Sequence, residues 1–205
     1  GHLHDLRRNN TLRLAHQLDP DATHAETAAR LALQLFDRTA DVHQLGGEAR
    51  QLLELAAFVH NVGLFIAHSG HHKHTYYIVR NSEQLTGFTD REVELLALVA
   101  RYHRKSHPSD KHPEFAALDA DDQHLVRVLA GLLRLAIGLD RRHRGVVRGV
   151  TVRAESGDDG DRLVIEPVVD EGTDVSVEVQ AAVDRSRLAA AALGVDVVVR
   201  ARGGA

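Results

Sequence analysis

The spacing of apolar residues changes once along this chain, near residue 145, and this change constrains the fold more than any other feature. Before it, apolar residues recur at helical spacing. One predicted helix carries Ala28, Leu31, Ala32, Leu35 and Phe36. After it, segments alternate apolar and polar residues and are rich in β-branched side chains, which favours strands. The sequence therefore predicts a mainly α chain, with a helical bundle over residues 5–144 and a small α/β extension over 145–205.

Capping signals place several helices of the bundle. Asp19 or Thr23 can begin the helix that contains the apolar stripe above. Thr89 with Glu92 three residues later is a capping-box pattern, and it predicts a helix that runs to about residue 102. Asp119 is expected to begin the long helix that follows. Further helices are expected over residues 52–59 and 75–85.

The extension is expected to have the order ββ-β-α-β. The predicted segments are strands 146–154, 162–168 and 175–179, a helix over 184–193 and a last strand over 195–201. A Gly-Asp-Asp-Gly turn at 157–160 joins the first two strands as a hairpin. A unit of this size buries too little apolar surface to be stable alone. We therefore expect it to pack against the helices.

Composition limits the chemistry and the setting of the chain. The absence of cysteine excludes disulfides, cysteine-zinc sites and thiol catalysis. The absence of methionine means that Gly1 is not a natural start, so residues 1–4 are expected to be a tag remnant and lead-in of an excised fragment. Without an apolar run of about 18 residues or a secretion signal, we expect a cytoplasmic protein with no membrane partner.

The net charge of −4 is unevenly distributed. Residues 101–153 carry eleven Lys and Arg against six Asp and Glu, whereas residues 154–205 carry five against eleven. A locally basic segment attracts anions whatever the total charge. The alternative is a solvated helix face. We expect an anionic partner other than nucleic acid.

Four sequence motifs resemble one family over nearly the whole chain. They are HSGHHKHTYYIVRNSE at 68–83, ARYHRKS at 100–106, HPEFAAL at 112–118 and LLRLAIGLDRRHR at 132–144. Together they resemble the C-terminal half of the exopolyphosphatase/guanosine-pentaphosphatase (Ppx/GppA) phosphatases. His24 and the His60-Asn61 pair also resemble a histidine–aspartate (HD) domain, which implies an HD-like helical bundle.

The resemblance implies a division of labour in the parent protein. Its N-terminal half, an actin-like phosphatase domain, removes terminal phosphate from polyphosphate or converts pppGpp to ppGpp. We expect that half to lie outside the present sequence. What remains implies a module that helps to hold the polyanion and contributes to a homodimer, with little activity alone. A divalent metal, Mg or Mn, is possible in the parent enzyme.

An HD site needs a histidine, a His-Asp pair and a distal aspartate, because neutral imidazoles and anionic oxygens together hold a divalent ion. Here Asn61 replaces the paired aspartate, and the distal position aligns with Ile137 rather than Asp140. We therefore expect at most a weak, vestigial metal site at His24, His60 and Asn61, aided by His74 or His103. The alternative is that these histidines bond each other or the backbone.

Cations from three segments are expected to form a phosphate channel. Helix N-termini favour anions, and arginine grips phosphate in bidentate fashion. The predicted contacts are His71, His72, Lys73, His74, Arg101, His103, Arg104, Lys105, Arg134 and Arg141. If the histidines touch phosphate, binding should strengthen as pH falls from about 7.5 to about 6, since imidazole is protonated near 6.5.

The sequence thus predicts a module that binds polyphosphate or a phosphorylated nucleotide such as pppGpp for a phosphatase. Two alternatives remain open. One is an autonomous metal-dependent HD-type phosphohydrolase with a degenerate site. The other is a dimerisation module.

Overall fold

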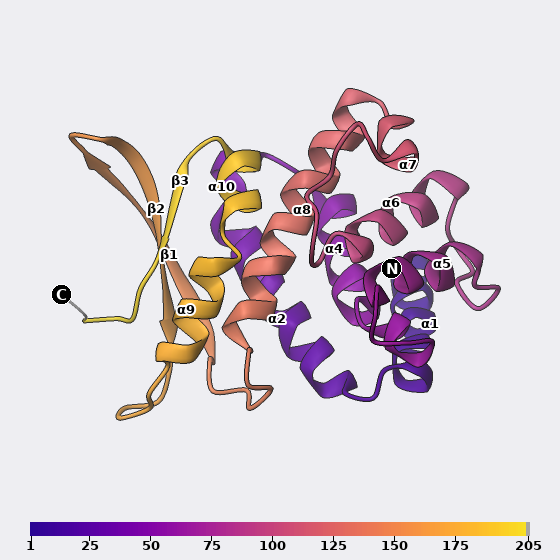
Figure 1. Ribbon diagram of the computed structural model, residues 1–205, viewed down its shortest axis with the longest axis horizontal. Helices are drawn as coiled ribbons and strands as arrows, with labels where there is room; N and C mark the ends of the chain where they lie inside the picture. The colour runs from indigo at the N-terminus through magenta and orange to yellow at the C-terminus, as the bar shows by residue number, and fades with distance from the viewer. Residues whose placement is uncertain (204–205) are drawn as a thin grey trace.

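A helical body with a small sheet at one end makes up residues 1–203, which the computed structural model describes (Figure 1). The helices of the body are α1 His2–Leu18, α2 Ala22–Arg38, α3 Ala40–His43, α4 Gly47–Val59, the 3-10 helix η1 Val62–Phe65, α5 His71–Asn81, α6 Asp90–Arg101, α7 Pro113–Ala116 and α8 Ala120–Leu139. The extension contains β1 Gly149–Gly157, β2 Gly160–Val168, α9 Ser176–Asp184, α10 Arg187–Leu193 and β3 Asp196–Val199. The predicted fold class, a helical bundle with a small α/β extension, is confirmed.

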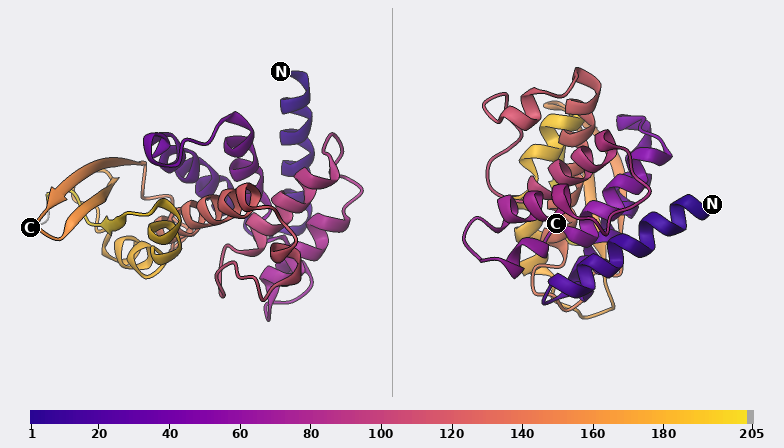
Figure 2. Two further views of the ribbon diagram at one scale, coloured as in Figure 1. Left: turned by 90° about the horizontal axis from the view of Figure 1, so that it is seen from above. Right: turned by 90° about the vertical axis from the view of Figure 1, so that its right-hand side faces the viewer.

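Helix α8 is the central element of the molecule. It packs against α2, α4 and α6 of the body and against α9 and α10 of the extension. Its apolar residues are almost all buried, among them Leu129 and Leu133. Seen from above, the sheet lies at the end of the molecule away from α1 (Figure 2). The core is therefore shared between the body and the extension along one helix.

Two glycines let the extension approach α8 closely. A Cβ at Gly131 would lie 2.7 Å from the backbone N of Ala189 in α10, and a Cβ at Gly138 would lie 2.8 Å from that of Ala182 in α9. A larger residue at either of these two positions would push α9 or α10 away from α8. The extension is thus seated on α8 through small residues from both sides.

The predicted caps are confirmed for two helices. Thr89 and Glu92 form a complete capping box at α6, and Asp119 accepts a hydrogen bond from the backbone N–H of Asp122 at α8. The cap predicted for α2 is wrong, because Asp21 accepts from the N–H of His24. Asp19 instead follows the last residue of α1 and accepts from the N–H of Asp21.

The sheet is simpler than predicted. Strands β1 and β2 form an antiparallel hairpin, with Gly157 opposite Gly160, and β3 runs parallel to β2 at the other edge. The strand predicted over 175–179 is wrong, because Val175 directly precedes α9 and residues 176–179 lie in its first turns. A run of five alternating residues fits either periodicity, and burial of Glu178 and Ala182 with exposure of Val177 follows the helical one.

None of the helices within residues 1–203 is both long and apolar enough to span a lipid bilayer.

Candidate functional site

Three buried histidines, one within a helix and two just after helix ends, form a histidine cluster. His24 lies in α2, while His60 and His103 closely follow the ends of α4 and α6, so two helix ends aim their imidazoles at the same place. The ring centroids of His24 and His60 are 5.7 Å apart, and those of His60 and His103 are 5.0 Å apart. His60 and His103 each donate Nδ1–H to the carbonyl three residues earlier, Ala57 and Ala100, at 2.6 Å.

The hydrogen bond from Arg104 determines which ring nitrogen of His71 carries the proton. Arg104 donates from Nη1 to Nδ1 of His71 at 2.7 Å, so the ring proton of neutral His71 lies on Nε2. That proton is donated to Nε2 of His103 at 3.2 Å, and His103 in turn donates to Ala100. A continuous chain of donors therefore links Arg104 to the end of α6.

Burial lowers the pKa of four imidazoles in this region. It lowers the pKa of His60 to about 3, with a further contribution from His24, and lowers the pKa of His103 well below its ordinary value. Burial and the nearby Arg104 lower the pKa of His71 and bring that of His72 to about 4. The predicted protonation of His71 and His72 near pH 6 therefore conflicts with their surroundings.

Gly63 lets the first turn of α5 approach the histidine cluster. A Cβ at Gly63 would collide with the carbonyl oxygen of His71, so only glycine permits this approach. The hydroxyl of Thr75 donates to the carbonyl of His60 at 2.9 Å and accepts from the N–H of Gly63 at 3.0 Å. These contacts explain why His71 reaches His103.

The predicted position of the distal carboxylate is wrong. Oδ2 of Asp140 lies 2.7 Å from Nδ1 of His24, and the Asp140 side chain is almost completely buried. Helix α8 ends at Leu139, so the chain turns at Asp140 and counting helical turns from Ile137 gives the wrong direction. Asp140 also accepts a hydrogen bond from the N–H of Gly145 at 2.9 Å. This bond connects the His24–Asp140 pair to the turn before the extension.

A second imidazole shields this pair from solvent. The ring of His143 stacks on that of His24, with centroids 3.6 Å apart and planes 3° apart. Nδ1 of His143 lies 2.7 Å from Oδ2 of Asp21, at the beginning of α2. His143 thus connects the ring of His24 to the side chain of Asp21.

Of the residues predicted to bind a metal, His24 and His60 belong to the histidine cluster and Asn61 follows His60 in the chain. Residues 1–203 contain no group of three or more His, Asp or Glu side chains placed to hold an ion. Asp140 is engaged with His24, and Asn61 supplies no charge. Nε2 of His60 is buried without a hydrogen-bond partner in the same part of the chain. The donor set thus fits a packed histidine cluster better than a divalent-ion site.

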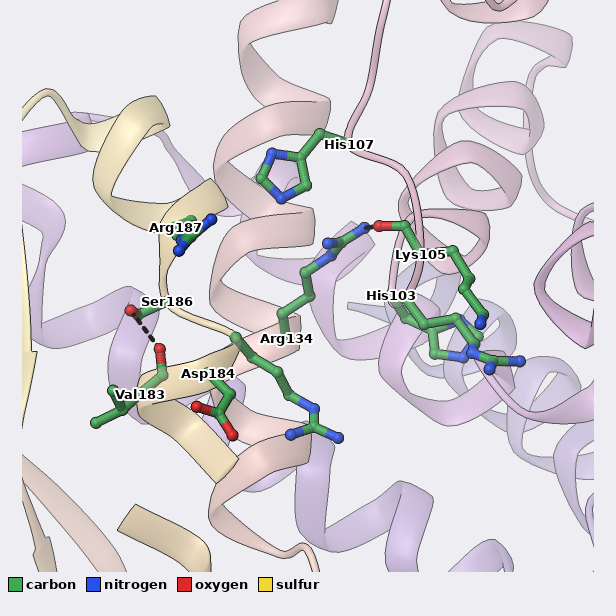
Figure 3. A pocket seen from close by; sticks show the side chains of 10 residues that line it. His103, Lys105, His107, Arg134, Val183, Asp184, Ser186 and Arg187 are labelled. Atoms are coloured by element: carbon green, nitrogen blue, oxygen red, sulfur yellow. Dashed lines mark hydrogen bonds between the residues drawn. The ribbon is translucent and has the colours of Figure 1, made fainter. Parts of the chain in front are cut away.

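A basic cleft of about 910 Å³ lies beside the histidines, between the loop after α6 and the turn from α9 to α10 (Figure 3). Helix α8 forms its floor through Arg134. Its charged and histidine side chains are His103, Arg104, Lys105, His107, Arg134, Asp184, Arg185 and Arg187. Five Lys and Arg residues thus surround a single carboxylate, so the cleft is suited to an anion.

Arg134 is the most unusual cation of the cleft because only 7% of its surface is exposed. Nε donates to the carbonyl of Tyr102 at 2.7 Å, and Nη2 donates to those of Lys105 and Ser106 at 3.0 and 3.1 Å. Burial, together with the neighbouring cation Arg185, lowers its pKa to about 10. It therefore stays charged near neutrality, with carbonyl oxygens rather than a carboxylate as partners.

Sequence reasoning missed three residues of the cleft lining. Arg185, Arg187 and His107 line it, although none was predicted to bind phosphate. Arg185 and Arg187 flank the break between α9 and α10, within the otherwise acidic residues 154–205. This short basic run in an acidic segment is the signal that could have revealed them.

The predicted phosphate contacts separate into groups. Four line the basic cleft, namely His103, Arg104, Lys105 and Arg134. His71 joins it through Arg104, and Arg141 lines a neighbouring hollow of about 480 Å³ that shares Arg185 and Asp184 with the cleft. Four others lie outside the cleft lining, namely His72, Lys73, His74 and Arg101.

Arg101 has a different role from the one predicted. Its guanidinium lies 3.5 Å from the carboxylate of Glu114 and over the rings of Tyr76 and Tyr102. These contacts neutralise and pack the side chain. Arg101 therefore secures the end of α6 rather than the cleft.

Comparison with known proteins places these features in a family. Residues 6–175 match the family described as Ppx/GppA phosphatase, domain III. A guanosine-5'-triphosphate,3'-diphosphate pyrophosphatase of Photobacterium profundum is 32% identical over 139 residues, which are 68% of this chain and 27% of that protein. A protein of the same name from Pseudoalteromonas translucida is 29% identical over 146 residues, 70% of this chain and 28% of that protein. The chain thus spans little more than a quarter of these relatives, and it belongs to the Ppx/GppA phosphatase family, where it matches domain III.

Proposed function

We propose that this domain binds a phosphate-rich anion, polyphosphate or a phosphorylated nucleotide such as pppGpp, in the basic cleft. The observation that carries the proposal is Arg134, a buried cation whose hydrogen bonds go to carbonyl oxygens and whose charged neighbour is Arg185. A buried charge is costly unless an opposite charge offsets it. A bound anion would supply that charge.

Phosphate suits the cleft better than a carboxylate ligand would. Arginine binds phosphate through a planar fork of donors, whereas lysine acts as a point charge. The loop after α6 supplies Arg104 and Lys105, and the turn between α9 and α10 supplies Arg185 and Arg187. Cations that face each other across a cleft can grip successive phosphates of one chain, at about 1 kcal/mol for each solvated contact.

The remainder of a family member is the proposed partner of this domain. We propose that phosphatase chemistry resides in an N-terminal actin-like half, and that this domain, HD-like in descent, holds the substrate while that half acts. A homodimer would bring two such clefts into one assembly. The alternative, an autonomous metal-dependent phosphohydrolase, is less well supported because residues 1–203 contain no group of side chains suited to a metal ion.

Calorimetric titration of the chain with long-chain polyphosphate tests the proposal. We expect measurable binding that weakens strongly with added salt, since counterions are released and charges are screened. Arg185→Ala combined with Arg187→Ala should weaken it by about thirtyfold, because two lost contacts at about 1 kcal/mol each remove about 2 kcal/mol. Arg148→Ala is the matched control, because Arg148 is an exposed arginine that pairs with Asp170 outside the cleft. Absence of binding by the unaltered chain would refute the proposed function.

A further inference from the structure

The loop after α6 is held by one buried side chain. The guanidinium of Arg134 donates to the carbonyls of Tyr102, Lys105 and Ser106, and these residues surround Arg104. We propose that Arg134 is the positioning residue of the basic cleft: it fixes this loop so that Arg104 and Lys105 meet the same anion. The inference rests on the proposed function, which it deepens.

The backbone of the loop needs such a restraint. Lys105 has a φ of +64°, in the left-handed region that residues with a Cβ rarely adopt. Two of the carbonyls that Arg134 binds, those of Lys105 and Ser106, belong to this strained residue and to the one that follows it. Arg134 is therefore placed to stabilise the conformation in which Lys105 is exposed at the cleft.

Arg104 is restrained from the opposite side. Its Nη1 donates to Nδ1 of His71, and His71 is fixed in turn by Nε2 of His103. The two cations of this loop thus have separate supports, Arg134 beneath the backbone and His71 beside the guanidinium. Only the first support is shared by both cations, because it acts on the backbone between residues 102 and 106.

The planar fork of arginine is essential to this role. Nε and Nη2 point in fixed directions and reach carbonyls spread over five residues of the loop. Arg134→Lys keeps a positive charge at the cleft floor but loses the fork. If Arg134 contacted the anion only through its charge, binding would survive this change. The conformation of residues 102–106, which needs the fork, would not.

A double-mutant cycle separates positioning from direct contact. In the full chain, Arg134→Lys should weaken binding of long-chain polyphosphate by about tenfold or more, a difference of about 1.4 kcal/mol. In the background of Arg104→Ala with Lys105→Ala, the same change should alter affinity by less than about twofold, because the loop no longer carries cations. Equal losses in both backgrounds, or no loss in the first, would overturn the inference.

Limited proteolysis tests the loop without any ligand. Trypsin cleaves after Arg104 and Lys105, and Arg134→Lys neither adds nor removes a cleavage site. We expect these two bonds to be cut several-fold faster in the variant, with cleavage after the exposed Arg148 as the internal reference. Unchanged cleavage would overturn the positioning role even if polyphosphate binds, and failure of the unaltered chain to bind polyphosphate would sink the proposed function separately.

A second pair of variants covers the case in which Arg134→Lys does not fold. Lys105→Gly and Lys105→Ala remove the same charge, but glycine adopts the positive φ without strain. If loop geometry governs the cleft, Lys105→Gly should bind polyphosphate several-fold more tightly than Lys105→Ala. Equal affinities would count against the inference.

Discussion

Oδ2 of Asp140 lies 2.7 Å from Nδ1 of His24, with 3% and 2% of these side chains exposed. The two residues are 116 positions apart and join the end of α8 to the first turn of α2. Asp140 also accepts from the N–H of Gly145. This pair is therefore a link between the helical body and the chain that leads into the extension.

Replacing Asp140 by alanine should destabilise the fold markedly. The change removes one partner of a buried, hydrogen-bonded pair and orphans His24 and the N–H of Gly145. We expect a loss of about 3 kcal/mol in the free energy of unfolding, measured by chemical denaturation. Asp170→Ala is the matched control, because Asp170 and its partner Arg148 are both more than 60% exposed. That control should cost less than about 1 kcal/mol, and similar losses for both variants would contradict the assignment.

Adding one methyl group at Gly138 should weaken the seat of the extension. A Cβ there would lie 2.8 Å from the backbone of Ala182, so α9 has to shift away from α8. We expect Gly138→Ala to lower the free energy of unfolding by about 1–3 kcal/mol. Gly47→Ala is the control, because a Cβ at Gly47 meets nothing within 4 Å at the start of α4. It should be neutral or slightly stabilising, by up to about 1 kcal/mol, and equal effects of the two changes would argue against close packing.

The features of the fold that depend only on neighbouring residues were predicted from the sequence. The change of periodicity near residue 145 marks the beginning of the extension, and the capping box at Thr89 and the cap at Asp119 lie where the sequence placed them. These features need only neighbouring residues to form. The alternating run 175–179 led to a wrong prediction of a strand. Packing against α8, a tertiary effect, makes this segment helical.

The site was less predictable for the same reason. Arg104, Lys105 and Arg134 were predicted to contact phosphate. That Arg185 and Arg187 line the same cleft depends on how the extension packs on α8. No local pattern encodes that contact. Asp140 was misplaced because its direction is set by the turn after α8 rather than by helical periodicity.

Affinity for polyphosphate should change little between about pH 7.5 and about pH 6, unlike the sequence-based expectation. The pKa of His72 is about 4, so His72 gains no proton in this range, and burial also lowers the pKa of His71. Burial also lowers the pKa of His107 in the cleft. Calorimetric titrations at both pH values should agree within about twofold, a difference of less than about 0.5 kcal/mol. A several-fold rise in affinity at the lower pH would indicate that imidazolium groups contact the anion.

Stability, in contrast to affinity, should depend on pH through the buried histidines. The pKa of His60 is about 3 in the folded protein, while a histidine in the unfolded chain titrates near 6.5. Below about pH 6.5 the unfolded state therefore binds a proton that folded His60 does not bind, and the folded state loses stability as pH falls.

Between about pH 7.5 and about pH 5.5, His60 alone should lower the free energy of unfolding by about 1.4 kcal/mol. His103, whose pKa burial also lowers, should add to the loss in the same direction. Urea denaturation at both pH values measures the effect, and His60→Gln should reduce the difference because glutamine does not titrate. His16→Gln is the control for loss of an imidazole outside the buried cluster, because 57% of the His16 side chain is exposed. If His60→Gln leaves the difference in free energy of unfolding between the two pH values unchanged, another group carries the pH dependence. Burial of His60 would then not govern stability below neutrality.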